Sequence, residues 1–213
     1  MVARALSRGI LGVVLAGGRS SRFGTDKAEA MLQGMSLLDR VCESAGPQVE
    51  KLLVNRNDSG RPGKICRFEC LPDEFPGEGP LAGVLAGLAR ARADGYAFLA
   101  TFPCDAPFFP RNAVSLLHGG LAASGADISV AKHNGVEHYA SALWRVSCAP
   151  VLSNAFAGGL RSIRGALNLF STIAVEFPAE GDGPGGDTFF NINKAENIVR
   201  AEQWMSSQAV RPA

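Results

Sequence analysis

The chain has 213 residues, and its 46% apolar content is sufficient to bury a full hydrophobic core. The net charge of +1, from 21 basic and 20 acidic residues, does not favour binding to nucleic acid or to an anionic membrane. Five cysteines without a C-x-x-C pair favour reduced cytoplasmic thiols over a disulfide framework or a zinc ribbon.

The N-terminus imitates a secretory signal, because two arginines within residues 1–8 precede an apolar stretch. That stretch is short and interrupted by glycine, and cleavage after it would remove a strand that carries a glycine-rich loop. No other run of the sequence approaches the roughly 20 apolar residues of a membrane-spanning helix. We therefore expect a cytoplasmic protein with one domain over residues 1–213, of which residues 1–8 form a loose leader.

Residues 15–27 read LAGGRSSRFGTDK and follow the apolar run 10–14. An apolar run that stops at paired glycines predicts a buried parallel strand, whose loop opens at the carboxyl edge of a sheet, where α/β proteins bind ligands. The glycines allow close approach of the backbone and the cations attract anions, so the loop predicts polyphosphate binding. It matches neither the Walker A loop nor G-x-G-x-x-G, and a glycine-rich turn with solvated cations is the alternative. The glycines are Gly17, Gly18 and Gly24, and the cations are Arg19, Arg22 and Lys27.

Strands and helices alternate along the rest of the chain. Strands are predicted over residues 51–54, 66–71, 96–101, 127–131 and 171–177. Helices are predicted after a Ser36 cap, from Pro80, and over residues 112–124, 145–157, 160–170 and 195–206. Asn134-Gly135 predicts a hairpin, with a strand toward Trp144 that lines a second substrate's pocket. This order predicts a three-layer α/β/α sandwich with a mostly parallel sheet.

Polar residues follow several of these strands. Asn55 follows residues 51–54, where a turn role and a ligand role are both open. Asp105 follows residues 96–101, and flanking prolines predict that it is held in an extended geometry with no neutralising partner. Because Mg²⁺ binds one or two carboxylates together with phosphate oxygens, Asp105 opposite a polyphosphate loop predicts a Mg²⁺ site.

The spacing LAGG-x3-R-x-G-x2-K in residues 15–27 resembles the signature of nucleotidyltransferases with a Rossmann-like, nucleoside-diphosphate-sugar pyrophosphorylase-like fold. With PCDAPF at 103–108 and FNIN at 190–193, the chain is most similar to the molybdenum cofactor guanylyltransferases, from about residue 10 to the last helix. That family joins GMP from GTP to molybdopterin. Gly17-Gly18 favours the guanylyl branch, because cytidylyl relatives tend to show Ala-Gly.

The resemblance implies roles for individual residues. The implied catalytic residues are Arg22, Lys27 and Asp105, with Asp105 as the ligand of Mg²⁺. The implied nucleotide-binding residues are Leu15, Ala16, Gly17, Gly18, Lys27, Asn55, Asp73, Gly79, Asp105, Asn191 and Asn193. Lys194-Ala195 replaces the family's Thr-Pro, so the resemblance does not supply a cap for the last helix. The implied partners are GTP, molybdopterin and, transiently, cofactor-biosynthesis proteins or molybdoenzyme chaperones.

Two further groups lie near the predicted hairpin. His133 and His138 lack a third metal ligand of suitable spacing, so we expect structural or substrate-contacting roles. The family usually shows a His-Pro pair here, whereas Tyr139 follows His138 in this chain. Arg161 and Arg164 are predicted on one face of the helix over residues 160–170, where they either hold the phosphorylated pterin or are solvated.

The function that this sequence predicts is nucleotidyl transfer, in which the phosphate of molybdopterin attacks the α-phosphorus of GTP and pyrophosphate leaves. Such chemistry depends on positioning and charge neutralisation, so no protein nucleophile is required. The alternatives are a molybdopterin cytidylyltransferase, a sugar-1-phosphate nucleotidyltransferase, and a non-catalytic nucleotide-binding partner of molybdoenzymes.

Overall fold

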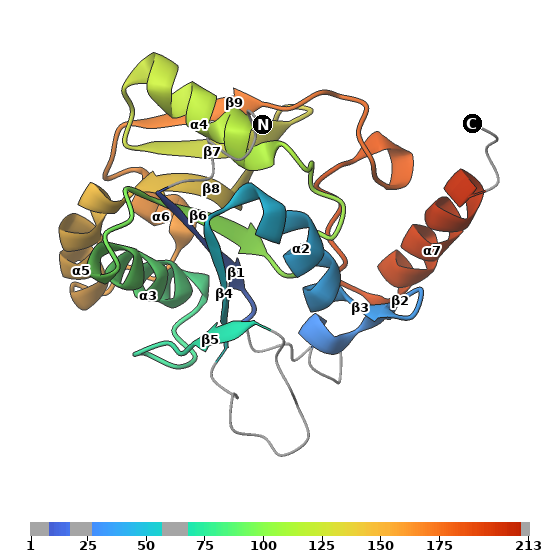
Figure 1. Cartoon of the computed structure of the whole chain (residues 1–213), viewed down its shortest axis with the longest axis horizontal. Helices are drawn as coiled ribbons and strands as arrows, with labels where there is room; N and C mark the ends of the chain where they lie inside the picture. The colour runs from blue at the N-terminus through green and yellow to red at the C-terminus, as the bar shows by residue number, and fades with distance from the viewer. Residues whose placement is uncertain (1–8, 18–26, 57–67, 210–213) are drawn as a thin grey trace.

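The computed structural model of the protein describes residues 9–17, 27–56 and 68–209. Its centre is a seven-stranded sheet in the order β5-β4-β1-β6-β8-β7-β9 (Figure 1). All neighbouring strands are parallel except those that pair with β8, so the predicted mostly parallel sheet is confirmed. The strands are β1 (Ile10–Leu15), β4 (Lys51–Asn55), β5 (Glu69–Leu71), β6 (Phe98–Pro103), β7 (Ile128–His133), β8 (Val136–Arg145) and β9 (Thr172–Glu176).

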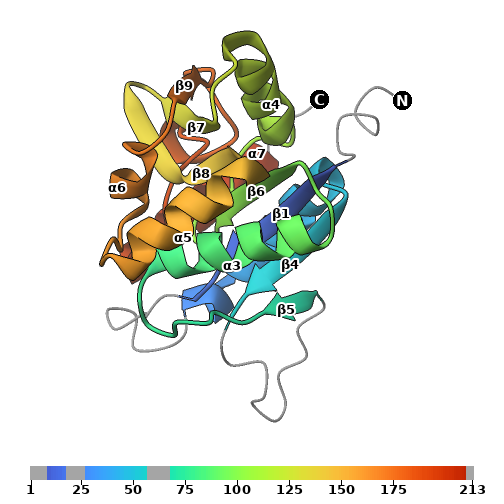
Figure 2. The same cartoon turned by 90° about the vertical axis from the view of Figure 1, so that its left-hand side faces the viewer.

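Helices cover both faces of the sheet, as the predicted sandwich requires. One face carries α3 (Pro80–Ala93), α5 (Ala149–Ala157) and α6 (Ile163–Leu167), and Figure 2 shows α3 and α5 side by side across it. The other face carries α2 (Leu37–Ala45) and α4 (Ala113–Ser124). Strand alternation explains this division, because in β1 Val14 faces the cluster of α2 and α4 and Val13 faces the cluster of α3 and α5.

Local sequence signals explain where the elements begin. The Ser36 hydroxyl accepts a hydrogen bond from the Asp39 N–H at 3.0 Å and so caps α2, as predicted. Pro80 occupies the first turn of α3 after Gly79, where its missing N–H costs nothing. Asn134 and Gly135 have φ values of 48° and 79°, the positive values that a tight hairpin turn between β7 and β8 needs.

Two predicted helices are wrong in extent. α5 begins at Ala149 because Pro150 fits only the first turn of a helix, and a 3₁₀ turn (Val146–Cys148) replaces the predicted start at residue 145. α6 is shorter than residues 160–170, because the extended Ser162 caps it. In residues 190–193, Ile192 is buried while Asn191 and Asn193 are exposed. Several predictions fall outside the described residues. They are the leader over residues 1–8, the start of the strand predicted over residues 66–71, and four residues of the glycine-rich loop: Gly18, Arg19, Arg22 and Gly24.

A small third cluster lies beside the sheet. The two-stranded hairpin of β2 (Met31–Leu32) and β3 (Met35–Ser36) packs with α7 (Ala195–Ala209) around Leu32 and Ile192 (Figure 1). The Gln33 side-chain amide donates to the Glu202 carbonyl at 3.5 Å. Among the described helices, none has the length and apolar content that a bilayer crossing requires.

Candidate active site

A cleft of about 990 Å³ lies at the carboxyl ends of β1, β4 and β6. This is the edge at which open α/β sheets bind ligands, and the sequence predicted the site there. Asp73 lies behind the cleft wall, where it is 8% exposed. The predicted site residues that line the cleft are Leu15, Ala16, Gly17, Lys27, Asn55, Gly79, Asp105, Asn191 and Asn193.

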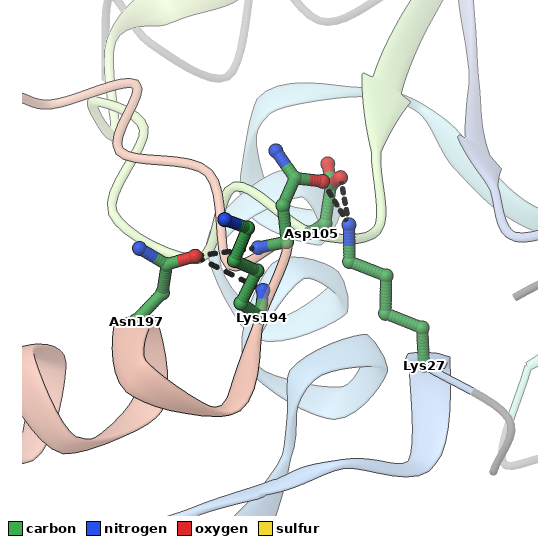
Figure 3. Close-up of polar contacts among 5 residues, drawn as sticks. Lys27, Asp105, Lys194 and Asn197 are labelled. Atoms are coloured by element: carbon green, nitrogen blue, oxygen red, sulfur yellow. Dashed lines mark hydrogen bonds and ion pairs between the residues drawn. The ribbon is translucent and has the colours of Figure 1, made fainter. Parts of the chain in front are cut away.

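Lys27 lines the cleft and pairs with Asp105 (Figure 3). Its ammonium nitrogen lies 2.5 Å from the Asp105 carboxylate and 2.5 Å from the side-chain oxygen of Asn193. The prediction that Asp105 has no neutralising partner is therefore wrong. A cation, a carboxylate and an amide therefore meet at one point, although they lie far apart in the sequence.

Asp105 is held in a turn, and the predicted extended geometry is also wrong. The turn follows β6 directly, with the Ala106 N–H 3.5 Å from the Pro103 carbonyl. The Asp105 carbonyl accepts a hydrogen bond from the Ile192 N–H at 2.8 Å. Since Ile192 is fully buried, this bond anchors the segment that carries Asn191 and Asn193 against the carboxylate turn.

Asn197 supplies the cap that the sequence left open. Its side-chain oxygen accepts hydrogen bonds from the backbone N–H groups of Asn193 at 3.1 Å and Lys194 at 3.0 Å (Figure 3). These bonds satisfy donors at the start of α7 that otherwise lack partners within the helix. The cap fixes the backbone on which the Asn193 side chain reaches toward Lys27.

Asn55 is buried at the end of β4, beneath the part of the cleft that Gly17 lines. It is 1% exposed, and its amide nitrogen donates to the Leu71 carbonyl at 3.1 Å and to the Asp73 carboxylate at 2.5 Å. A β-carbon on Gly17 would lie 3.0 Å from the Asn55 side-chain oxygen, and one on Gly83 only 2.3 Å away. Both glycines therefore make room for Asn55. Sequence reasoning missed Gly83, whose signal is a glycine inside a helix where alanine is favoured.

The N-terminus of α3 opens into the cleft through Gly79 and Pro80. Gly79 has φ 85° and ψ −178°, a backbone region available almost only to glycine. The first turn of a helix has N–H groups without intrahelical partners and the positive end of the helix dipole. An anion in this part of the cleft is therefore stabilised by α3.

Arg161 and Arg164 both line the cleft, but they do not share a helix face as predicted. Arg161 precedes the α6 cap and pairs with Glu78, and its guanidinium also donates to the Phe156 carbonyl at 2.7 Å. Arg164 is within α6, and its guanidinium lies 5.9 Å from the centre of the Tyr139 ring. The two cations thus reach the cleft from separate segments.

The two hairpin histidines differ in their surroundings. His133 is 2% exposed, and its ring nitrogens lie 3.4 Å from the Asp187 carboxylate and 3.3 Å from the Ala179 carbonyl, which is a structural role. His138 is half-buried and lines the cleft. Burial lowers the pKa of His138, the nearby Asp187 opposes that shift, and His133 adds to it. Within the described part of the chain, no group of three or more His, Cys, Asp or Glu residues could hold a metal ion.

A mostly parallel α/β sheet with a glycine-bordered cleft at its carboxyl edge is typical of the nucleotide-binding α/β class. Residues 12–171 match the family described as the MobA-like NTP transferase domain, and the chain belongs to that family of nucleotidyltransferases. The resemblance noted in the sequence is confirmed at this level.

Relatives match the chain over nearly its whole length. It is 39% identical to the molybdenum cofactor guanylyltransferase of Sinorhizobium fredii over 91% of each chain. It is 38% identical to the molybdenum cofactor guanylyltransferase of Cereibacter sphaeroides, covering 94% of this chain and 99% of the relative.

Solved structures share the fold. Molybdopterin-guanine dinucleotide biosynthesis protein A of Archaeoglobus fulgidus superposes with a TM-score of 0.72 at 27% identity, over 93% of this chain and 99% of that chain. The 2-C-methyl-D-erythritol 4-phosphate cytidylyltransferase of Thermus thermophilus has a TM-score of 0.65 at 15% identity, over 92% and 98% of the chains. At that identity the second likeness shows the fold alone.

Proposed function

We propose that this chain transfers GMP from GTP to the phosphate of molybdopterin, with release of pyrophosphate and formation of the guanine dinucleotide form of the molybdenum cofactor. The observation that carries the proposal is the meeting of Lys27, Asp105 and Asn193 in the cleft, a group called the centre below. It occurs in a chain whose relatives, over 91% of its length, are named molybdenum cofactor guanylyltransferase. The α-phosphate of the nucleotide is the natural occupant of this centre.

In the proposed reaction, a phosphate oxygen of molybdopterin forms a bond to the α-phosphorus of GTP. The bond from that phosphorus to the bridging oxygen of the β-phosphate breaks, and pyrophosphate leaves with the electron pair. The Lys27 ammonium neutralises charge on the phosphates, and the N-terminus of α3 stabilises anionic oxygens. Gly17 allows the backbone to approach the nucleotide closely. The buried Asn55 side chain packs beneath Gly17 and supports that stretch of backbone. The protein thus contributes orientation and charge.

The residues at the centre fit a bound Mg²⁺. The Asp105 carboxylate and the Asn193 amide oxygen converge on one cationic group, Lys27, and both are the hard oxygen donors that Mg²⁺ takes. We propose that Asp105 holds the ion together with phosphate oxygens of the nucleotide. When bound there, Mg²⁺ would supply charge stabilisation for the phosphates in the transition state.

The proposed setting is the cytoplasm, with transient contacts to cofactor-biosynthesis proteins or molybdoenzyme chaperones that deliver and receive the cofactor. The cysteine spacing supports a reducing compartment, since the five cysteines contain no C-x-x-C pair.

The test is a turnover assay with molybdopterin, Mg²⁺ and each of GTP, CTP, ATP and UTP, with pyrophosphate release as the readout. GTP should give the fastest release and the largest rise in melting temperature. Equal or faster release from CTP would move the assignment to a cytidylyltransferase. Nucleotide binding without pyrophosphate release would identify a non-catalytic nucleotide-binding protein.

A further inference from the structure

The order of the strands gives the cleft two distinct ends. β4 and β1 deliver Asn55 and Gly17 to one end, together with the N-terminus of α3. Asp105 follows β6 in the middle, and the β7–β8 hairpin lies beyond β6 in the sheet. The transferred phosphate must lie between two substrates. We therefore expect the end with Asn55 and Gly17 to bind the nucleotide and the hairpin end to bind a different molecule. The hairpin end is the one left for the acceptor.

A bulge in the β7–β8 pairing directs side chains of the hairpin toward that end of the cleft. Val130 of β7 pairs with Ala142 of β8, but the next residue, Ala131, pairs with His138, so that residues 139–141 lie between consecutive pairs. The pairing of β6 with β8 also stops at Ala142. In a regular strand, neighbouring side chains point to opposite faces, whereas a bulge re-aims them. Here the neighbours His138 and Tyr139 both line the cleft.

The His138 ring in the bulge is supported by aromatic side chains of the core. The His138 ring stacks on Phe189 with centroids 4.4 Å apart and planes inclined by 20°. Phe189 is 2% exposed and meets Phe177 edge-on at 5.1 Å, so the core holds it in place. Burial lowers the pKa of His138, which keeps the imidazole neutral at neutral pH. A neutral, half-buried ring on a rigid aromatic base is suited to stacking against a flat heterocycle.

We propose that the hairpin end of the cleft is an aromatic subsite for the fused heterocycle of the acceptor, with His138 as the ring that stacks on it and Tyr139 beside it. The inference rests on the proposed function for the identity of that acceptor, a pterin. Stacking needs only a π-face, so the subsite itself is defined by a planar heterocycle. Holding the heterocycle there orients the acceptor so that its phosphate reaches the centre at Asp105.

The test compares His138→Ala, His138→Phe and Lys132→Ala. Lys132 lies on the neighbouring strand and loses only a surface ion pair to Glu176, so it is the matched control. His138→Ala should raise the KM for molybdopterin about tenfold while leaving the KM for GTP unchanged, and His138→Phe should retain most of the affinity. An unchanged KM for molybdopterin in His138→Ala, or an equal rise in the KM for GTP, would overturn the subsite.

A second measurement separates this inference from the proposed function. Pterin-6-carboxylate, which lacks the dithiolene and the phosphate, is titrated without nucleotide, and its fluorescence quenching is followed. Wild type should bind it, and His138→Ala should bind it about tenfold more weakly. If wild type fails to transfer GMP to molybdopterin yet shows this difference, the proposed function fails and the subsite stands. Absent binding to wild type, or equal binding to both proteins, overturns the subsite.

Discussion

The substitution Gly83→Ala tests whether Asn55 is held by close packing beneath the cleft. Gly83 lies inside α3, where replacing glycine by alanine normally stabilises by about 0.4–1 kcal/mol. The new β-carbon, however, would lie 2.3 Å from the Asn55 side-chain oxygen and 2.9 Å from Leu15 Cδ2. Asn55 cannot rotate away without breaking its hydrogen bonds to the Leu71 carbonyl and to Asp73.

The structure sets the expected size of the effect. Overpacking a tight site costs about 1–3 kcal/mol, and a lost buried hydrogen bond adds about 1 kcal/mol. After the helix gain is subtracted, Gly83→Ala should destabilise by about 2 kcal/mol, which for a chain of this length lowers the melting temperature by about 4–8 °C. Displacing Asn55 should also reduce the stabilisation that GTP and Mg²⁺ provide.

Gly119→Ala is the matched control, because Gly119 lies inside α4 and a β-carbon there would meet no atom within 4 Å. It should raise the melting temperature by about 1–4 °C through the helix gain alone. Thermal unfolding of both variants, followed by circular dichroism with and without GTP and Mg²⁺, makes the comparison. An equal rise for Gly83→Ala and Gly119→Ala would refute the packing argument.

Three further predictions concern the cleft. Lys27→Ala should raise the KM for GTP at least tenfold with little change in melting temperature, because its charge faces ligand, and wild-type turnover at subsaturating GTP would contradict this. Asp105→Asn keeps the volume of the side chain but removes its charge, so the rate of pyrophosphate release should fall about 10²–10³-fold, more than the nucleotide affinity falls. An unchanged Mg²⁺ dependence of pyrophosphate release would contradict the metal role of Asp105. Burial lowers the pKa of His138 below its ordinary value of 6.5, so the unfolded chain binds more protons and stability declines as pH falls through that value. Urea unfolding between about pH 7 and pH 5 should show a smaller decline for His138→Phe than for wild type.

The fold was largely predictable because its signals are local. The apolar run of β1, the Ser36 cap, Pro80 in the first turn of α3 and the Asn134-Gly135 turn each act within a few residues, and the structure confirms all four. The insertion of β8 between β6 and β7 was not predictable in the same way. A hairpin signal identifies which strands pair with each other, but not which strand of the sheet they join.

The site was predictable in its strand ends and not in its contacts. The ends of β1 and β4 at Gly17 and Asn55 follow from sequence pattern, since parallel strands end at one edge. The contact of Lys27 with Asp105 joins residues that lie 78 positions apart, and no periodicity encodes it. The bulge at His138 was equally hidden, because it depends on how β7 and β8 lie in register.

The third cluster explains how these distant residues come to one point. Lys27 begins a 3₁₀ turn (Lys27–Glu29) that leads into the β2–β3 hairpin, and Asn193 lies shortly before α7. Packing of the hairpin on α7 therefore fixes the positions of both residues in the cleft. The hydrogen bond from Ile192 to the Asp105 carbonyl then ties that unit to the end of β6. A long lysine side chain loses up to about 2 kcal/mol of rotamer freedom when it is fixed. The two oxygen partners of Lys27 compensate for this loss and so hold its side chain in the cleft.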